Sequence, residues 1–240
     1  MNKEQLLKLA EALRPAVAAS DHSVQSLIYQ WNLGDLLEHL TRECDAKVCL
    51  TVSDLVYCSQ KYWFRLQHPL PVIEQNIYGP WGVYGRLIHL GLEHLLREKW
   101  NGVRIEVEVE RRLWLNNGEP TLVKITGRID ALRVTDGGEV VVYEFKSSRG
   151  DSEQPKQPHI MQLRIYMLMA SATKGYLVYV NPDRVAEYEI NNPMNDVDLK
   201  QLVKETIENT KHPRWDWECS YCPYNMMCPY KHFSNNYKRR

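Results

Sequence analysis

The chain has 240 residues, of which 44% are hydrophobic and 25% are charged, as in an ordinary globular domain. Its 30 basic and 30 acidic residues cancel, so any contact with nucleic acid has to come from a local patch rather than from bulk charge. No apolar stretch is long enough to span a bilayer, and Glu4 and Glu11 interrupt the apolar run that a secretory signal needs. We therefore expect a cytoplasmic protein.

Hydrophobic spacing and turn residues predict the order of the elements. Apolar residues at helical spacing predict helices over residues 3–14, 24–43, 53–66 and 83–98, with Ser53 as the N-cap of the third. The segment 69–80 is rich in Pro and Gly and predicts a loop. Strands are predicted over 103–110, 121–134, 139–146 and 176–180, and further helices over 158–172 and 196–210. This mixed order indicates an α/β or α+β sheet with helices packed on it.

Two carboxylates mark the predicted hairpin that turns at residues 135–138. The turn places Asp130 opposite Tyr143 or Glu144, which brings the two carboxylates within a few ångströms of each other. Such a pair is unfavourable at neutral pH unless a proton or a cation lies between them, and hard divalent cations prefer oxygen ligands. The pattern therefore predicts a metal site. Lys146 lies on the same strand face as Glu144, where its charge could orient a metal-bound nucleophile.

This Asp, followed by Glu-x-Lys on the next strand, resembles the core of the PD-(D/E)xK nuclease superfamily. A solvated sheet face is the alternative, because exposed Glu–Lys pairs are common on strands. Three further residues strengthen the resemblance, although each alone also fits an ordinary structural role. His89 lies on the predicted helix before the sheet, where an imidazole could complete the metal site. Gln162 and Tyr166 share one face of the helix after the hairpin, where they could touch DNA.

In this order, the motifs resemble the RecB-like branch of the superfamily. The matching segments are a helical Gly-x-x-x-His, a Gly-Arg-Ile-Asp strand, a Glu-Phe-Lys strand and a helical Gln-x-x-x-Tyr. The resemblance implies an α/β restriction-endonuclease-like core with a central mixed sheet flanked by helices. The implied Mg²⁺ or Mn²⁺ ligands are His89, Asp130, Glu144 and the backbone carbonyl of Phe145. Lys146 would be the catalytic lysine, while Gln162 and Tyr166 would close the active site and handle DNA.

The cysteines carry a second metal pattern. Of the six, three form C-x2-C-x5-C near the C-terminus at Cys219, Cys222 and Cys228, and Cys58 is the candidate fourth ligand. In a reducing compartment we expect metal binding or catalysis rather than disulfides. One upstream and three downstream cysteines resemble the iron–sulfur nucleases of the superfamily, which implies a [4Fe–4S] cluster, or [2Fe–2S], that joins the N- and C-terminal segments. A structural zinc site is the alternative. Cys44 and Cys49 lie outside the family pattern.

Because the chain has no room for helicase motors, the family that it most resembles is that of the stand-alone CRISPR-associated RecB-like exonucleases. The resemblance implies a metal-dependent deoxyribonuclease that hydrolyses single-stranded DNA or overhangs and trims fragments for CRISPR spacer acquisition, with the CRISPR integrase complex as a partner. The alternative function is a non-cleaving, metal-stabilised DNA-binding or assembly subunit. The predicted parts are an N-terminal helical extension (1–50), a nuclease domain (51–232) and a basic tail (233–240). Tyr62, Trp63 and Trp81, near Lys61 and Arg65, are candidates to stack bases, although core and interface roles are commoner for such residues.

Overall fold

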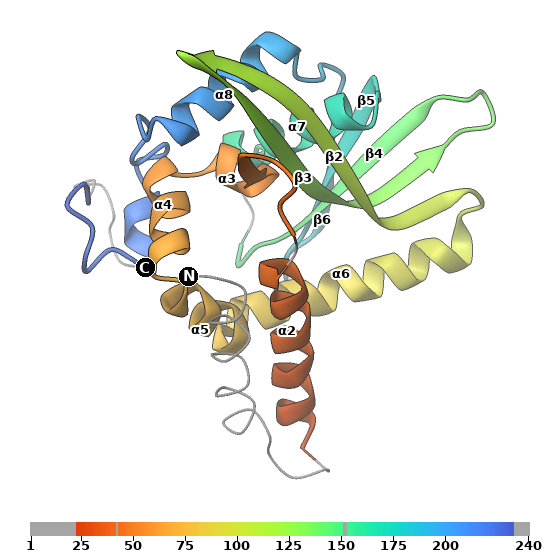
Figure 1. Ribbon diagram of the computed structural model, residues 1–240. Coiled ribbons are helices and arrows are strands. Elements are labelled where there is room, and N and C mark those ends of the chain that lie inside the picture. Colours follow the sequence, from red (N-terminus) through yellow and green to blue (C-terminus); the bar gives the residue numbers. More distant parts are fainter. Residues whose placement is uncertain (1–22, 42, 151–152, 233–240) are drawn as a thin grey trace.

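The computed structural model describes residues 23–41, 43–150 and 153–232, and its centre is a six-stranded mixed sheet (Figure 1). The predicted helix over 3–14 and the basic tail over 233–240 lie outside the described residues. The strands are β1 (Val48–Thr51), β2 (Val103–Asn117), β3 (Glu119–Val134), β4 (Val140–Ser147), β5 (Lys174–Val180) and β6 (Val185–Ile190). The helices are α2 (Val24–Thr41), α3 (Val52–Val56), α4 (Ser59–Gln67), α5 (Leu70–Tyr78), α6 (Pro80–Lys99), α7 (Gln157–Met169), α8 (Asp196–Ile207) and the short 3₁₀ helix η1 (Glu218–Tyr221).

Strand β3 pairs with three other strands, and the pairing differs between its two edges. Strand β2 pairs antiparallel along one side, from Val103 opposite Arg133 to Asn117 opposite Glu119. The other side is divided, because β1 pairs parallel with 123–126 and β4 pairs antiparallel with 131–134. Residues 127–130 therefore lie between two ladders. Strands β5 and β6 extend the sheet beyond β4.

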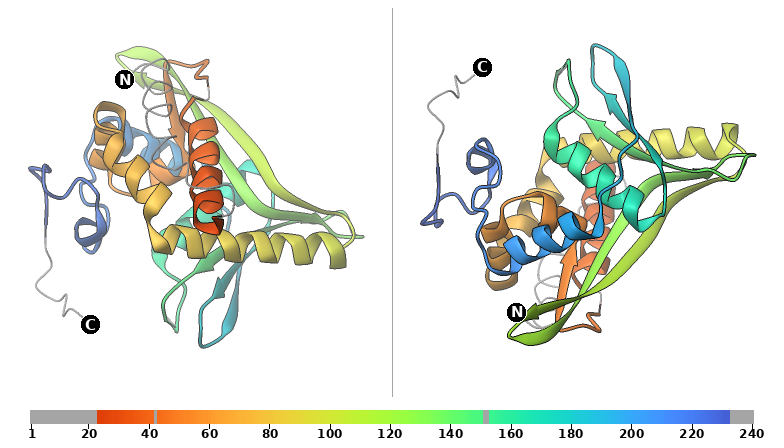
Figure 2. Two further views of the ribbon diagram at one scale, coloured as in Figure 1. Left: turned by 90° about the horizontal axis from the view of Figure 1, so that it is seen from below. Right: turned by 90° about the horizontal axis from the view of Figure 1, so that it is seen from above.

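Helices cover both faces of the sheet (Figure 2). The larger core cluster joins Leu132, Val142 and Leu177 of the sheet to residues of α3, α7 and α8, and Leu163 and Leu199 are fully buried in it. A smaller cluster on the opposite face packs Tyr143 and Phe145 against Leu92 and Leu96 of α6. Alternate residues of β4 thus point to different helices, as the two-residue period of a strand requires.

The structure confirms most predicted elements and corrects two segments. The segment 69–80, expected as a loop, contains α5, because Pro is compatible with the first turn of a helix and Ile73 and Ile77 bury one face of it against α2. The helix expected over 53–66 is two helices that break at Tyr57 and Cys58. Its N-cap is Thr51 rather than Ser53, because Thr51 and Asp54 form a reciprocal capping box. Strands β1 and β6 were not predicted.

Candidate active site

Asp130 is held at the point where the β3–β4 ladder ends. Ala131 pairs with Tyr143, so the register places Asp130 opposite Glu144, which is one of the two predicted pairings. The backbone N–H of Phe145 donates to Asp130 Oδ2 at 2.7 Å. Asp130 is only 8% exposed. The hydrogen bond fixes one carboxylate oxygen and leaves the other directed to His89, whose Nδ1 lies 3.4 Å from Asp130 Oδ1.

Lys146 connects the strand to α7. Its Nζ lies 2.6 Å from Glu144 Oε1 and 2.9 Å from Gln162 Oε1, and Gln162 Nε2 lies 3.5 Å from the Tyr166 hydroxyl. Gln162 and Tyr166 share a helix face, as their spacing predicts. That face is buried and directed to Lys146. These two side chains are therefore positioning residues that hold the lysine.

Gly127 allows Tyr166 to approach the sheet. A Cβ atom at Gly127 would lie 2.5 Å from Tyr166 Cε1 and 2.9 Å from Val52 Cγ2. Residues 127–130 lie between the β1 and β4 ladders, so the ring from α7 packs where β3 has neither strand beside it. The glycine of the Gly-Arg-Ile-Asp motif thus has a steric role, which links the motif to the position of the Gln-x-x-x-Tyr helix.

The buried charges influence one another strongly. Burial, reinforced by the negative charge of Asp130, raises the pKa of Glu144 to about 7. Burial alone would lower the pKa of Lys146, but the carboxylates of Glu144 and Asp130 outweigh it and raise that pKa. Burial likewise opposes the protonation of His89, whereas its contact with Asp130 raises its pKa. The raised pKa of Glu144 indicates that Lys146 does not fully compensate its ionised form, so a cation bound beside this carboxylate would stabilise it.

The donor atoms of this cluster fit a hard divalent cation. Glu144 Oε2 is buried and has no hydrogen-bond partner among the described residues, an arrangement that is unfavourable unless another group supplies a positive charge. Asp130 and His89, whose Oδ1 and Nδ1 atoms lie 3.4 Å apart, are close enough for their charges to shift the pKa of Glu144. Within residues 23–41, 43–150 and 153–232, however, no three His, Cys, Asp or Glu side chains are grouped closely enough to hold a metal ion. The ligand set therefore remains a prediction that the chemistry of these residues supports.

Two acidic residues that the sequence did not single out adjoin the site. Glu93 lies one turn after His89 on α6 and is 7% exposed, and burial, with Glu106 and Asp130 nearby, raises its pKa to about 7. Glu106 falls opposite Asp130 in the β2–β3 register and adopts a left-handed backbone with φ 54°. Both line a cavity of about 580 Å³ together with His89. The i, i+4 spacing of His89 and Glu93 was the available sequence signal, because it places both on one helix face.

The four predicted cluster cysteines come together at one cavity of about 350 Å³, although Cys58 is 161 residues from Cys219 in sequence. Cys58 is the N-cap of α4, and η1 and the turns after it carry Cys219, Cys222 and Cys228. Glu218 connects the two segments, because its carboxylate accepts backbone N–H groups of Cys58 (2.8 Å), Arg214 (2.9 Å) and Trp215 (2.9 Å). Burial raises the pKa of Cys58 to about 11. Four free thiols thus line one cavity, and the iron–sulfur cluster that they would bind stays a prediction.

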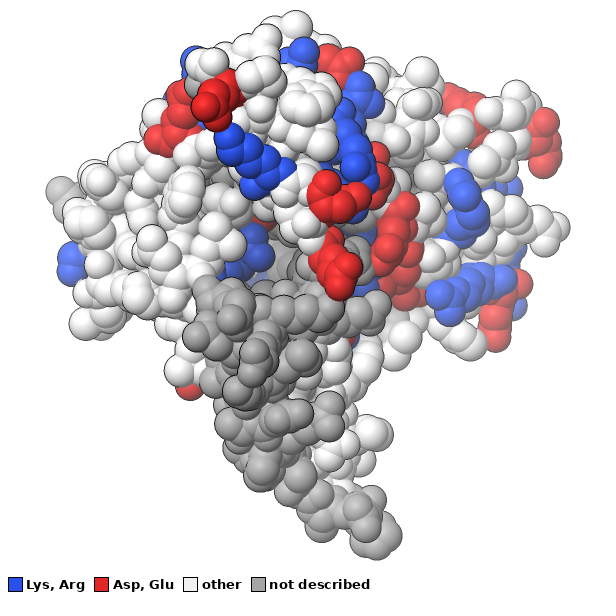
Figure 3. All heavy atoms as spheres, viewed as in Figure 1, with Lys and Arg blue, Asp and Glu red and all other residues white. Residues whose placement is uncertain are grey.

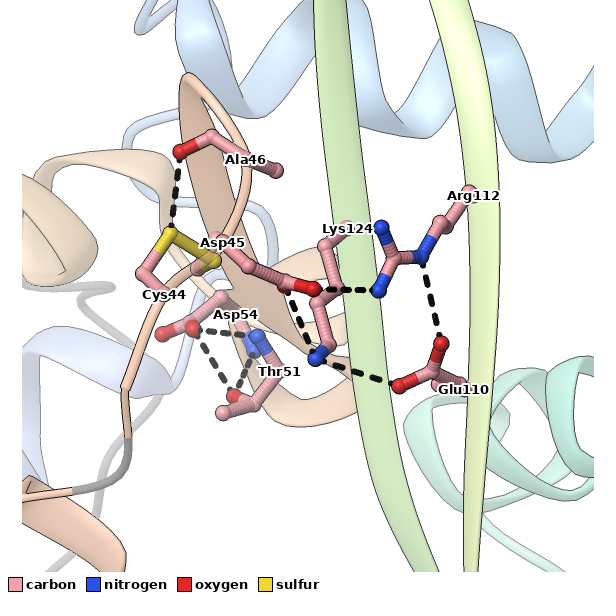
Figure 4. The surroundings of a disulfide bond; sticks show 9 residues. Cys44, Asp45, Ala46, Thr51, Asp54, Glu110, Arg112 and Lys124 are labelled. Atoms are coloured by element: carbon pink, nitrogen blue, oxygen red, sulfur yellow. Dashed lines mark hydrogen bonds and ion pairs between the residues drawn. A yellow bond between two sulfur atoms is a disulfide. The ribbon is translucent and has the colours of Figure 1, made fainter.

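The remaining two cysteines correct the expectation that none forms a disulfide. Cys44 and Cys49 are joined by a disulfide just before and within β1 (Figure 4). Asp45 lies inside the loop that it closes and pairs with Arg112 of β2 and with Lys124 of β3, whose Nζ lies 3.0 Å from Asp45 Oδ1. The two cysteines are only five residues apart, so they can meet within one short loop. The expectation of free thiols was based on the cellular compartment and not on this spacing.

The aromatic candidates separate into buried and exposed residues. Tyr62 is 6% exposed in the main core, and Trp63 packs against that core with its indole N–H donating to the Thr206 carbonyl at 3.3 Å. The structure therefore contradicts a base-stacking role for these two. Trp81 is 49% exposed and lines the same cavity as His89.

The sequence and the fold are both similar to those of known proteins. The family model of the PD-(D/E)XK nuclease superfamily matches residues 90–229, and the CRISPR-associated exonuclease Cas4 of Saccharolobus solfataricus (strain ATCC 35092 / DSM 1617 / JCM 11322 / P2) is 40% identical over 196 residues, or 82% of this chain and 94% of that protein. The chain belongs to the PD-(D/E)XK nuclease superfamily and to the family of the Cas4 exonuclease. Its fold agrees, because the crystal structure of SSO0001 superposes with a TM-score of 0.78 at 36% identity and covers 88% of this chain and 99% of that one.

Membership in this superfamily identifies the chain as a nuclease with a mixed central sheet flanked by helices. The matched range 90–229 includes Asp130, Glu144, Lys146 and three of the four cluster cysteines. His89 and Cys58 lie before that range and are brought to these groups by the fold. Among the helices of the described residues, none combines the length and apolarity that a membrane crossing requires.

Proposed function

We propose that the protein is a Mg²⁺- or Mn²⁺-dependent DNA exonuclease that hydrolyses phosphodiester bonds of single strands or overhangs. The observation that carries this proposal is the buried, unpaired Glu144 Oε2 beside Asp130, with Lys146 fixed next to it. The exonuclease activity is supported by the name of the Saccharolobus solfataricus relative, to which most of the chain aligns. The preference for single strands, the metal requirement and a cytoplasmic location belong to the proposal.

The residues have distinct roles in this mechanism. His89, Asp130, Glu144 and the Phe145 carbonyl would hold the ion, which when bound supplies an activated water and a Lewis acid for the phosphate. The Phe145 N–H fixes Asp130 so that one carboxylate oxygen stays directed to the ion site. Lys146 is the catalytic residue that orients the nucleophile and stabilises the negative charge that develops on the phosphate. Gln162, supported by Tyr166, prevents the lysine side chain from leaving that position.

The four cysteines around the 350 Å³ cavity would bind a [4Fe–4S] cluster, with [2Fe–2S] as the alternative type. Cys58 belongs to the segment before α4, whereas Cys219, Cys222 and Cys228 belong to the C-terminal turns. A cluster there would link the two ends of the nuclease domain predicted over 51–232, and its role would be structural. A zinc ion is the competing occupant, and iron content distinguishes the two.

The biological role that we propose is the trimming of DNA fragments before their insertion as CRISPR spacers, in association with the CRISPR integrase complex. This role is supported by the relative from Saccharolobus solfataricus, which is a CRISPR-associated exonuclease. DNA affinity should depend on a limited patch, because the net charge is zero and Figure 3 shows acidic and basic side chains intermixed on the face drawn.

The test is an assay of labelled single-stranded DNA with Mn²⁺. Wild-type protein should shorten the DNA, and Asp130→Ala should not, because one of the two oxygen donors to the ion is removed. Asp136→Ala is the matched control, because Asp136 is an exposed carboxylate in the turn of the same hairpin. Lys146→Ala should lose activity but still bind Mn²⁺ in a calorimetric titration.

Two results would contradict the proposal. Asp130→Ala that digests DNA at the wild-type rate would show that the carboxylates are not catalytic. A wild-type protein that binds DNA and Mn²⁺ without shortening the strand would instead support a non-cleaving DNA-binding or assembly subunit.

A further inference from the structure

The cavity that His89 lines also contains two tryptophans that the superfamily motifs do not include. Trp31 of α2 and Trp81 of α6 line the cavity of about 580 Å³ that also contains His89. They remain 37% and 49% exposed, respectively, whereas Trp63 packs against the core. A cavity of this size has room for a nucleotide-sized ligand, and the exposed indoles that line it provide flat apolar surfaces.

Each indole is paired with an arginine that holds it in place. The Arg86 guanidinium lies 4.2 Å from the Trp31 ring centroid, and the same side chain pairs with Asp35 at 2.8 Å. The Arg149 guanidinium lies 3.8 Å from the Trp81 ring centroid. Arg149 comes three residues after Lys146. Its contact with Trp81 therefore joins this tryptophan to the segment that follows the lysine. Contacts of this kind stabilise the rings without covering their whole surface.

The acidic and basic side chains that line this cavity are equal in number, with Asp35, Glu93 and Glu106 against Arg86, Arg97 and Arg128. Arg128 pairs with Glu106 at 2.8 Å and with Asp35 at 3.4 Å, and Arg86 also pairs with Asp35. Glu93 adds a further carboxylate to the lining. Arg149 beside Trp81 is one further cation, so a phosphodiester would meet little net positive charge at this cavity. What the two tryptophans offer a nucleic acid is stacking, which requires a base that is unpaired and turned out of a helix.

We propose that Trp31 and Trp81 form a nucleobase-stacking subsite that holds an unpaired base of the DNA strand next to the catalytic cluster. The inference rests on the proposed nuclease function and deepens it, because it gives a structural reason for a preference for single strands. It also assigns a substrate contact to α2, which precedes the range matched by the superfamily. The subsite replaces the earlier candidates Tyr62 and Trp63, which are part of the core or packed against it.

The experiment compares two single-stranded oligonucleotides of equal length, one with all its bases and one with abasic nucleotides near both ends. Initial cleavage rates with Mn²⁺ give kcat/KM for each. Loss of one stacking contact lowers affinity by about 5- to 150-fold. Trp31→Ala and Trp81→Ala should therefore reduce kcat/KM by about tenfold or more on the complete strand and by less than about twofold on the abasic strand. Trp31→Phe should retain most of the wild-type preference, because a ring remains.

Binding is measured in parallel so that the subsite is tested even without cleavage. Anisotropy titrations of the same labelled strands with Asp130→Ala protein should show the same loss for the two Trp→Ala changes on the complete strand only. The loss should be equal at about 50 and about 200 mM salt, because stacking neutralises no phosphate. Trp114→Ala is the matched control, since Trp114 is 60% exposed on β2 and does not line this cavity.

The outcomes separate the subsite from the nuclease. An equal loss on both strands would assign the tryptophans a structural role, and no loss on either would show that they do not contact a base; both results overturn the inference. Wild-type protein that binds the complete strand better than the abasic strand but cuts neither would overturn the proposed exonuclease function while supporting the subsite.

Discussion

The residues of the candidate active site belong to strands and long helices, whereas those of the cysteine cavity lie largely in turns and short helices. Asp130, Glu144 and Lys146 project from β3 and β4, and Gln162 holds the lysine from α7. The cysteines lie in a break between two helices, in the short helix η1 and in the turns that follow it. Hydrogen bonds join these segments, among them those that Glu218 accepts from the Cys58 N–H at 2.8 Å, that the Trp215 indole donates to the Val56 carbonyl at 2.9 Å, and that the Tyr224 hydroxyl donates to the His68 carbonyl at 2.9 Å.

This difference indicates which site depends on its cofactor. The core clusters around the sheet hold the active-site backbone in place whether or not an ion is bound, because apolar burial supplies most folding free energy. The C-terminal segment offers few such contacts, although Tyr224 is fully buried. We therefore expect metal removal to stop catalysis at the first site and to loosen the fold at the second.

The largest effect is expected at the cysteine cavity. The proposed iron–sulfur cluster should make the wild-type protein brown. Cys58→Ala or Cys228→Ala should lose this colour and the iron, and should lower the free energy of unfolding by several kcal/mol, by analogy with about 5 kcal/mol for a disulfide that closes about 100 residues. Visible absorbance, iron content and Tm measure these losses. Nuclease activity should fall as well, because the core loosens.

Two findings would contradict the proposed iron–sulfur cluster or its ligands. Colourless wild-type protein with stoichiometric zinc would show that the cavity holds a single ion and not a cluster. A coloured Cys58→Ala variant with normal iron content would show that Cys58 is not the fourth ligand.

The next effect concerns the contact between sheet and helix at the active site. Gly127→Ala should destabilise the protein by about 1–3 kcal/mol, because the new methyl group would collide with Tyr166 and Val52. It should also slow DNA cleavage and leave the iron content unchanged. Denaturant unfolding and the DNA assay measure both. Gly34→Ala in α2 is the control, since a Cβ there meets nothing within 4 Å, and it should be neutral or stabilise by about 0.5–1 kcal/mol. Equal effects of the two changes would contradict the steric role of Gly127.

A further change tests the disulfide at β1. Cys44→Ser or Cys49→Ser should lower the free energy of unfolding by about 2 kcal/mol in the absence of reductant, because a short loop in the unfolded chain is no longer closed. Nuclease activity and iron content should stay at wild-type levels, since neither cysteine contributes to the two sites. Loss of iron in either variant would show that the pair takes part in assembling the cluster.

The smallest effect is expected at the positioning residues. Gln162→Ala and Tyr166→Phe should each slow cleavage by about tenfold, equivalent to about 1.4 kcal/mol, because Lys146 loses part of its support. Affinity for Mn²⁺ should not change, which a titration can verify. Unchanged rates in both variants would remove α7 from the mechanism, and lost metal binding would make Gln162 part of the ion site.

The sequence identified the candidate site residues because the chemistry of a side chain is a local property. The turn at 135–138 fixed the hairpin register, and the observed pairing of Ala131 with Tyr143 agrees with one of the two expected alternatives. The polar spacing of Gln162 and Tyr166 also gave their shared face correctly. It did not show that this face is buried and directed to Lys146, because the periodicity of a helix does not specify which surface its polar residues meet.

Tertiary structure decided the relations between distant segments. The sequence determined which side chains can bind a cation, carry a positive charge or supply a thiolate, because those properties belong to each residue. Only the fold placed His89 beside Asp130, Cys58 at the cavity of the C-terminal cysteines, and Trp31 at the cavity that His89 lines. It also buried Glu144 Oε2 without a partner. These features depend on packing between elements far apart in the chain, and packing is where desolvation and proximity set the chemistry of a charged group.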